Sequence, residues 1–255
     1  MFIRTERSIK EFIQLYPVVS VIVIIHLLLF VIIDILSLQI GNLIYQWGVG
    51  NNFYINQGEY WRLLTSIFLH AGLSHTLFNS LALILFGPAL EQMLGKFKFV
   101  AAYVLAGLAG NLGTYIIEPT MFDTIYVGAS GAIYGLFGIY IYMMLFQKHL
   151  IDSQNARIVV IILVIGLVMT FLRPGINIAA HIFGFIGGFA LGPLILSNAK
   201  AFSVWRNQRS DNSASTAQFD PNRWQKKRTN KKIMKRILWT AFVILVVLGI
   251  VGRFL

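Results

Sequence analysis

Long uncharged apolar runs are the feature that most limits what this chain can fold into. A helix needs about 20 predominantly apolar residues to cross the hydrocarbon core of a bilayer. Because 57% of the residues are hydrophobic, only 12% are charged and the mean hydropathy is +0.72, an ordinary soluble domain is excluded. The sequence predicts an all-α polytopic membrane protein whose helices span residues 17–36, 74–94, 97–117, 125–146, 157–173, 177–197 and 237–254.

The segments between these runs divide the chain into regions. We expect a tail over 1–16, a core of six helices over 17–197, a linker over 198–236 that is first Ser/Asn-rich and then basic, and a seventh transmembrane helix over 237–254. The outer loop, residues 37–73, is too long for a simple connector. Its aromatic residues are of the kind that settles at a membrane interface: Tyr45, Trp47, Phe53, Tyr54, Tyr60, Trp61 and Phe68.

The distribution of Lys and Arg predicts the orientation. With the N-terminus in the cytoplasm, 18 of the 21 basic residues fall on the inner side and only Arg62, Arg173 and Arg253 fall outside. The C-terminus is then outside. This topology accounts for the net charge of +11, so no nucleic-acid partner is expected. The basic run 223–236 either contacts anionic membrane lipids or, as we favour, holds the start of the seventh span inside. Lys-rich inner loops fit a bacterial cell membrane.

Polar side chains inside the spans are the candidates for function, because such groups are costly in a bilayer. His75 and Asn79 lie near the outer end of one span, Ser130 in a second and His181 in a third. Ser130 and His181 are each predicted about five residues, roughly 8 Å, inside the outer helix ends. His75 and Asn79 share a face because residues i and i+4 are neighbours. Three helices are therefore expected to bring these groups to one depth.

Small residues at helical spacing predict close packing of the spans that carry Ser130 and His181. Small residues four apart allow helix backbones to approach closely in lipid. The sets are Gly131 and Gly135 in one span, and Ala180, Gly184, Gly188 and Gly192 in the other.

Taken in order, these residues resemble the rhomboid family of intramembrane serine proteases. The resemblance covers Trp61 to Gly192 and includes Trp61-Arg62, His75-xxx-Asn79, Gly128-Ala129-Ser130-Gly131 and Ala180-His181-xx-Gly184-xxx-Gly188. It implies six helices around a water-accessible cavity, with the outer loop partly embedded in the outer leaflet. Glu91 and Gly95 also resemble the family pattern, in a structural role.

The resemblance implies an endopeptidase that cleaves transmembrane proteins near the outer membrane face. Ser130 would be the nucleophile and His181 the general base, acting as a dyad because no buried Asp completes a triad. His75, Asn79 and the Ser130 backbone N–H would hold the oxyanion.

Supporting roles follow from the same resemblance. Tyr134 would orient the His181 ring by packing, and Gly128 and Gly131 would support the nucleophile. Trp61 would anchor the outer loop at the interface, and Arg62 would do so by snorkelling.

A metal site is not expected. The chain has no Cys, and no cluster of His and carboxylates shows ligand spacing, so neither a metal nor another cofactor is predicted. His26 and His70 are interpreted as structural and His149 as solvated.

Two other functional classes stay open beside the protease. A catalytically inactive rhomboid-like protein would bind membrane clients, and loss of Ser130 or His181 would have favoured it. A transporter or channel would show inverted repeats and broken helices at the midplane, which we do not find. The oligomeric state is left open.

Overall fold

The computed structural model describes residues 6, 8–120 and 122–203. The predicted seventh span, residues 237–254, and the predicted linker beyond residue 203 lie outside the described residues. The elements, in chain order, are α1 (Ile9–Leu15), α2 (Pro17–Phe30) continued by the π-helical turn η1 (Val31–Ile35), α3 (Gln39–Gly48), β1 (Gly50–Asn51), α4 (Asn52–Asn56), α5 (Arg62–Thr65), α6 (Gly72–Leu94), α7 (Lys96–Ile117), β2 (Ile125–Tyr126), α8 (Ser130–Phe146), the 3-10 turn η2 (Lys148–Leu150), α9 (Ser153–Leu172) and α10 (Ile178–Ile195).

Each of the first six predicted spans contains one long helix. Among the described residues, five helical segments are long and apolar enough to cross a bilayer: α2 with η1, α6, α7, α9 and α10. The remaining helix, α8, is equally apolar but has 17 residues. The predicted all-α class holds apart from β1 and β2, which pair antiparallel with Gly50 opposite Tyr126. The chain is a multi-pass membrane protein.

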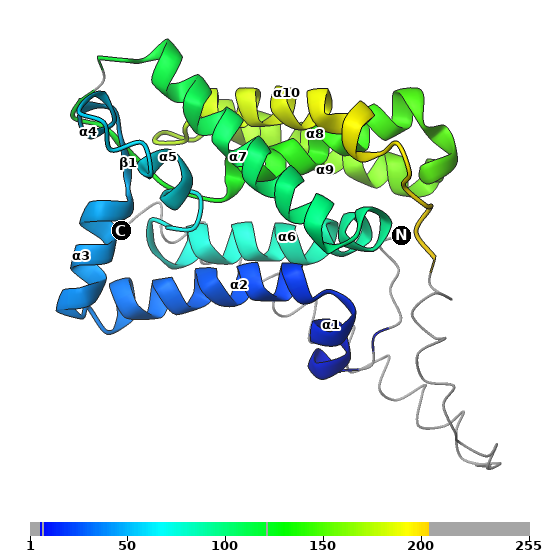
Figure 1. Ribbon diagram of the computed structural model, residues 1–255, viewed down its shortest axis with the longest axis horizontal. Helices are drawn as coiled ribbons and strands as arrows, with labels where there is room; N and C mark the ends of the chain where they lie inside the picture. The colour runs from blue at the N-terminus through cyan, green and yellow to red at the C-terminus, as the bar shows by residue number, and fades with distance from the viewer. Residues whose placement is uncertain (1–5, 7, 121, 204–255) are drawn as a thin grey trace. The chain divides into compact units, whose positions relative to one another are not determined.

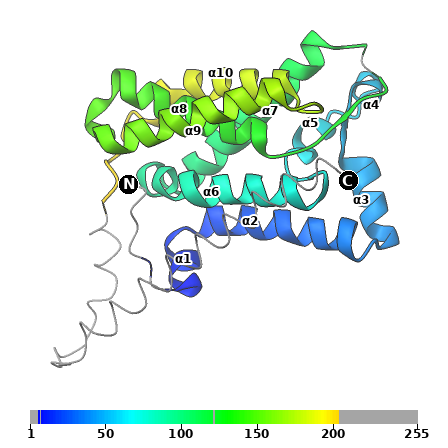
Figure 2. The same ribbon diagram turned by 180° about the vertical axis from the view of Figure 1, so that it is seen from behind.

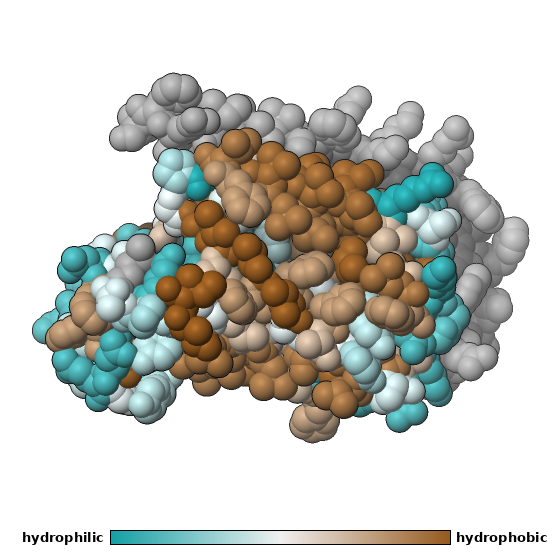
Figure 3. All heavy atoms as spheres, turned by 90° about the horizontal axis from the view of Figure 1, so that it is seen from above, coloured by the Kyte–Doolittle hydropathy of each residue, from teal (hydrophilic) through white to brown (hydrophobic). Residues whose placement is uncertain are grey.

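The outer loop forms its own small structure at one end of the long helices. Figures 1 and 2 show α3, α4 and α5 gathered there, with α3 set across the end of α2. Figure 3 shows a broad band of apolar residues across the middle of one face, with hydrophilic residues at both ends. This pattern is expected where a hydrocarbon layer surrounds the helices and water lies on either side.

Helix α2 is attached to α6 through a buried carboxylate. The Glu91 oxygens accept the backbone N–H groups of Val18 and Val19 at 2.9 and 2.8 Å. These N–H groups lie in the first turn of α2, where no intrahelical acceptor exists. Gly95, with φ 79°, then allows α7 to begin at once after α6. These contacts give a physical basis for the structural roles predicted for Glu91 and Gly95.

Helix α8 is the centre of the bundle and packs most extensively on α10 and α7. Its closest contact is with α10, where Gly184 lies against the carbonyl of Gly131 and Gly188 against the carbonyl of Gly135. A Cβ atom at Gly184 or Gly188 would overlap those oxygens. The predicted small-residue packing is confirmed, and it brings the backbones of α8 and α10 into direct contact.

We predict that Gly188→Ala destabilises the protein. A glycine-to-alanine substitution within a helix normally stabilises the helix by about 1 kcal/mol. Here the added methyl group must push α10 away from α8, and overpacking of this kind costs about 1–3 kcal/mol. After the helix-propensity gain is subtracted, a net loss of up to about 2 kcal/mol remains, so the thermal unfolding midpoint in detergent should fall by up to about 8 °C. Ala190→Val, at an exposed position of the same helix, is the control and should leave the midpoint nearly unchanged. A midpoint that rises in Gly188→Ala would contradict this packing.

Candidate active site

Ser130 and His181 form a hydrogen-bonded pair. The Oγ atom of Ser130 lies 2.8 Å from Nε2 of His181, and the His181 residue is only 7% exposed. His181 stands in the first turn of α10, whose N-terminus is fixed by Asn177. The Asn177 Oδ1 atom accepts the N–H of Ala180 at 2.8 Å. The two residues predicted to form the dyad are therefore brought together.

The position predicted for Ser130 within its helix is wrong. The helix does not start at residue 125, because Ile125 and Tyr126 form the strand paired with β1. The chain then turns at Gly128, which has φ 128° and donates its N–H to the Ser66 carbonyl at 2.9 Å. Ser130 is consequently the first residue of α8 rather than a residue about five positions inside it.

The start of α8 carries backbone donors that no side chain caps. Its N-cap residue, Ala129, has no hydrogen-bonding side chain, whereas Asp152 caps α9 and Asn177 caps α10. The first N–H groups of a helix lack intrahelical acceptors and lie at the positive end of its dipole. The N–H of Ser130 is one of these groups, so negative charge beside Ser130 is favoured.

Tyr134 packs on the His181 ring as predicted. The two rings are stacked, with centroids 4.2 Å apart and planes inclined by 15°. The Tyr134 hydroxyl lies 2.9 Å from Oγ1 of Thr170. Tyr134 follows Ser130 by one helical turn, so α8 supplies both the hydroxyl and the ring that holds the imidazole.

Thr170, on α9, is a site residue that the sequence analysis missed. Its Oγ1 atom lies 2.8 Å from Nδ1 of His181. The available signal was a single threonine on the buried stripe of α9, seven positions after Leu163. Without the structure, a lone hydroxyl in an apolar span gives no indication of its partner.

His75 lies beside the turn that leads to Ser130. The backbone N–H of Ala71 donates to Nδ1 of His75 at 3.3 Å, which leaves the proton of the neutral ring on Nε2. A Cβ atom at Gly128 would come within 2.7 Å of that Nε2 atom. Gly128 is therefore required for its φ angle and for the space that the His75 ring occupies.

Asn79 is linked to His75, but through the backbone. Its Nδ2 donates to the carbonyl of His75 at 2.9 Å, and its second amide hydrogen is left available. Within residues 6, 8–120 and 122–203, no hydrogen bond joins His75 or Asn79 to Ser130 or His181. The predicted shared face of His75 and Asn79 exists, and the His75 ring lies against Gly128, two residues before Ser130.

Arg62 is buried rather than snorkelling, which corrects the predicted mechanism. The residue is 3% exposed, and its Nε donates to Glu59 at 2.6 Å. Its Nη1 donates to the carbonyls of Gln46 and Val49 at 2.7 and 3.0 Å. A guanidinium needs several acceptors when water is removed, and the outer loop supplies them. Arg62 thus ties α3 to α5 from within.

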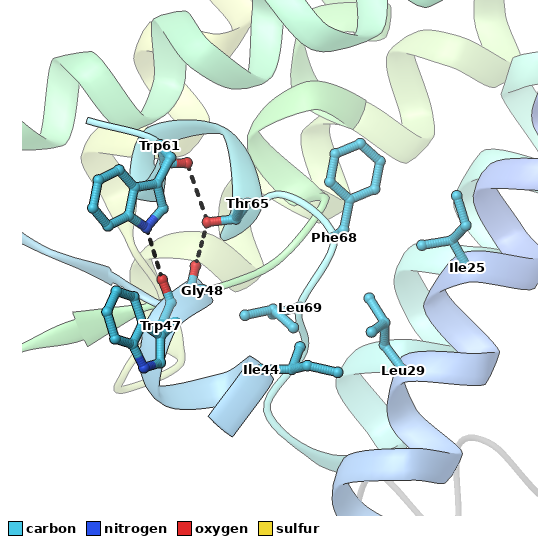
Figure 4. Close-up of a pocket in the computed structure, with 9 residues that line it drawn as sticks. All are labelled: Ile25, Leu29, Ile44, Trp47, Gly48, Trp61, Thr65, Phe68 and Leu69. Carbon is cyan, nitrogen blue, oxygen red and sulfur yellow. Dashed lines mark hydrogen bonds between the residues drawn. The ribbon is translucent and has the colours of Figure 1, made fainter. Parts of the chain in front are cut away.

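Trp61 stabilises the same loop from its surface. Its indole N–H donates to the Trp47 carbonyl at 3.1 Å, and the two indole rings stack with centroids 6.3 Å apart. Figure 4 shows Trp47 and Trp61 beside Thr65, whose hydroxyl donates a hydrogen bond to the Gly48 carbonyl. These residues line an apolar cavity of about 430 Å³ that residues of α2 also line. The cavity lining includes neither Ser130 nor His181.

The remaining histidines differ in their surroundings. His26 is fully buried, and its Nε2 lies 3.4 Å from the Tyr103 hydroxyl. Its ring packs edge to face on the His70 ring, with centroids 4.5 Å apart. Burial, reinforced by the His26 and His75 rings, lowers the pKa of His70 to about 2, so His70 is neutral. His149 is exposed in η2. His26 and His70 are thus buried and His149 is exposed, and the roles given to them stay predictions. Across the described part of the chain, no group of acidic, His or Cys side chains has the arrangement of a metal site.

The fold and the paired Ser130 and His181 define a class: multi-pass membrane proteins with a serine–histidine site among their helices. The family model described as the Rhomboid domain matches residues 57–198. The chain therefore belongs to the rhomboid family, as the resemblance predicted.

Individual relatives agree with this assignment. The YdcA protein of Bacillus subtilis (strain 168) is 44% identical over 194 residues, which cover 75% of this chain and 94% of YdcA. The rhomboid protease GluP of the same organism is 38% identical over 157 residues, which are 61% of this chain and 30% of GluP. RHOMBOID-like protein 5 of Arabidopsis thaliana is 34% identical over 143 residues, covering 56% of this chain and 46% of that protein.

We predict that Arg62→Met loosens the outer loop. Methionine keeps the length of an unbranched side chain but removes the N–H donors to Glu59, Gln46 and Val49. This loss should lower the free energy of unfolding by about 2 kcal/mol or more. The thermal unfolding midpoint should fall, and limited proteolysis should cut within residues 37–73 faster than in the wild type. Lys148→Met, at an exposed position in η2, is the control. Equal cleavage rates in the loop for both variants would contradict the role given to Arg62.

Proposed function

We propose that this protein is an intramembrane serine endopeptidase that cleaves transmembrane proteins with a Ser130–His181 dyad. The observation that carries the proposal is the 2.8 Å contact between Ser130 Oγ and His181 Nε2. A serine hydroxyl is a weak nucleophile until a base within hydrogen-bond reach can take its proton. Membership of a family that includes a rhomboid protease supports the same chemistry.

The first half of the reaction forms an acyl-enzyme. Ser130 Oγ attacks the scissile carbonyl carbon while His181 Nε2 accepts the hydroxyl proton. The tetrahedral intermediate collapses when the C–N bond breaks and His181 gives its proton to the leaving amine. The product with the new N-terminus leaves, and the other part of the substrate remains as an ester on Ser130.

The second half regenerates the enzyme. A water molecule gives a proton to His181 and attacks the ester carbonyl. Collapse of this second intermediate returns the proton to Ser130 Oγ and releases the new carboxyl terminus. Every proton passes through one imidazole nitrogen, so the stacking of Tyr134 on that ring matters in both halves.

Three donors are proposed to stabilise the oxyanion. They are the Ser130 N–H at the uncapped start of α8, the Nε2–H of His75 and the free amide hydrogen of Asn79. Removing one donor of this kind typically costs about 10²–10³ in rate. His75 and Asn79 come from α6, so the oxyanion site draws on a different helix from the nucleophile.

Substrate and orientation follow from the bilayer setting. We propose transmembrane proteins as substrates, cleaved near the outer face, where α8 and α10 begin. The N-terminus is then cytoplasmic, in keeping with the excess of Lys and Arg on that side. The bacterial relatives support a place in a bacterial cell membrane. No cofactor is required by this mechanism.

The alternative is a rhomboid-like protein that binds membrane clients without cleaving them. It would need no nucleophile and no base. Both residues are present and in contact, so the observations favour the protease.

The experiment is cleavage of a reporter with a helix-destabilising transmembrane segment by purified protein in proteoliposomes. Ser130→Ala and His181→Ala should each lower the rate by at least about 10³-fold. Matched controls are Ser80→Ala, a buried serine of α6, and His149→Ala, an exposed histidine; both should cleave as the wild type does. A metal chelator should have no effect.

Two outcomes would reject the proposal. Undiminished cleavage by Ser130→Ala would show that another group is the nucleophile. A folded wild type that is inert toward several reporters would favour the client-binding alternative.

A further inference from the structure

We propose that Thr170 is a positioning residue that holds His181 in the tautomer with its proton on Nδ1. The consequence for catalysis rests on the proposed function, whereas the assignment of the tautomer does not. Thr170 lies on α9, while Ser130 and His181 lie on α8 and α10, so this hydroxyl adds a third helix to the pair.

The hydroxyl of Thr170 has three close polar neighbours. Its Oγ1 lies 2.8 Å from the Gly166 carbonyl oxygen, 2.9 Å from the Tyr134 hydroxyl and 2.8 Å from His181 Nδ1. All three distances are within the hydrogen-bond range. A hydroxyl can donate one hydrogen bond and accept two, so Thr170 can make one hydrogen bond with each of its three neighbours.

Only one assignment of hydrogens makes every contact a hydrogen bond. The Gly166 carbonyl can only accept, so the single hydrogen of Thr170 must point to it. Both lone pairs of Oγ1 then accept, one from the Tyr134 O–H and the other from His181 Nδ1–H. If Thr170 instead donated to Nδ1, two oxygens would face each other at 2.8 Å without a hydrogen between them.

The tautomer that results is the one a general base needs. A neutral imidazole carries one ring hydrogen, so a hydrogen on Nδ1 leaves a lone pair on Nε2. That nitrogen is the one 2.8 Å from Ser130 Oγ. The opposite tautomer would place a hydrogen between Nε2 and Oγ, and Nε2 would be unable to accept the serine proton. By accepting the hydrogen on Nδ1, Thr170 thus holds the His181 tautomer, which is a task of the buried carboxylate in a triad.

The burial of Thr170 supports a specific role. The residue is 1% exposed, and it occupies the stripe where Val159 and Leu163 face the bundle. Neighbouring residues of α9 face outward, with Val168 49% and Met169 48% exposed. A buried hydroxyl costs free energy unless it is bonded. Its bond to Gly166 alone would satisfy the donor, but it would leave both lone pairs unused.

Close packing of α9 against Tyr134 also helps to hold the Thr170 hydroxyl in place. A Cβ atom at Gly166 would come within 2.8 Å of the Tyr134 hydroxyl, so α9 approaches Tyr134 closely at this level. Tyr134 in turn stacks on His181. The ring is thus held on its face by Tyr134 and at its Nδ1 edge by Thr170.

The direct test is ¹⁵N NMR of the full chain in detergent, labelled on its five histidines, at a pH where the His181 ring is neutral. The His181 signals are assigned by their loss in His181→Gln. In the wild type, Nδ1 should appear as the protonated nitrogen and Nε2 as the unprotonated one. Thr170→Val keeps the shape but removes the acceptor, so the other tautomer should become populated. Thr170→Ser, which restores a hydroxyl, should return the wild-type spectrum.

The kinetic test uses the same variants on the transmembrane reporter. In Thr170→Val, kcat should fall by about 10- to 100-fold, the loss expected when a buried donor loses its acceptor, with KM little changed. Thr170→Ser should recover most of the rate. Thermal unfolding of each variant identifies any loss that comes from misfolding.

The outcomes separate this inference from the proposed function. An unprotonated Nδ1 in the wild type, or an unchanged His181 spectrum in folded Thr170→Val, overturns the role of Thr170 even if the protein cleaves reporters. A wild type that shows the expected tautomer but cleaves no reporter leaves the role of Thr170 in place and rejects the protease.

Discussion

The direct backbone contact between α8 and α10 is the constraint on which the rest of the structure depends. Gly131 and Gly135 offer carbonyls to α10, and Gly184 and Gly188 have no side chains to hold that helix away. In lipid, helix association relies on close packing, because hydrocarbon chains are as apolar as the helices. Ser130 and His181 stand at one end of this contact. Their 2.8 Å separation is therefore a consequence of the glycines as much as of the two side chains.

The candidate site is built from uncharged side chains and a helix dipole rather than from ionised residues. Among the residues that the structure describes, no buried carboxylate lies beside His181; a stacked Tyr134 and the Thr170 hydroxyl contact the imidazole instead. Neutral groups avoid the free-energy cost of placing a charge among apolar helices. The uncapped start of α8 provides a positive end of a dipole in the same region without an ionised residue. These features suit chemistry that must take place within a membrane protein.

Much of the fold was predictable because the bilayer limits the alternatives. Hydrophobic length alone located six helices, and glycine spacing predicted that two of them touch. The start of α8 was misplaced because Ile125 and Tyr126 are as apolar as the helix that follows. Their pairing with Gly50 and Asn51 is a long-range contact that no local pattern reports.

The candidate site could be predicted only in part, for a similar reason. Ser130, His181, His75 and Asn79 form ordered motifs in the sequence. Thr170 forms none, since its importance comes from a neighbour eleven residues away on another helix. Arg62 was predicted at the membrane surface because Arg commonly snorkels. The acceptors that hold it inside the outer loop are mainly backbone carbonyls, which every residue has and no sequence distinguishes.

In the proposed mechanism, Ser130 is a nucleophile activated by His181. The purified protein would be treated with a fluorophosphonate, and the site of modification would be located by peptide mapping with mass spectrometry. We expect one phosphonylated residue, Ser130. Its rate of modification should be at least about 100-fold lower in His181→Ala, because no base then takes the serine proton. An adduct on another serine, or an unchanged rate at Ser130 in folded His181→Ala, would contradict it.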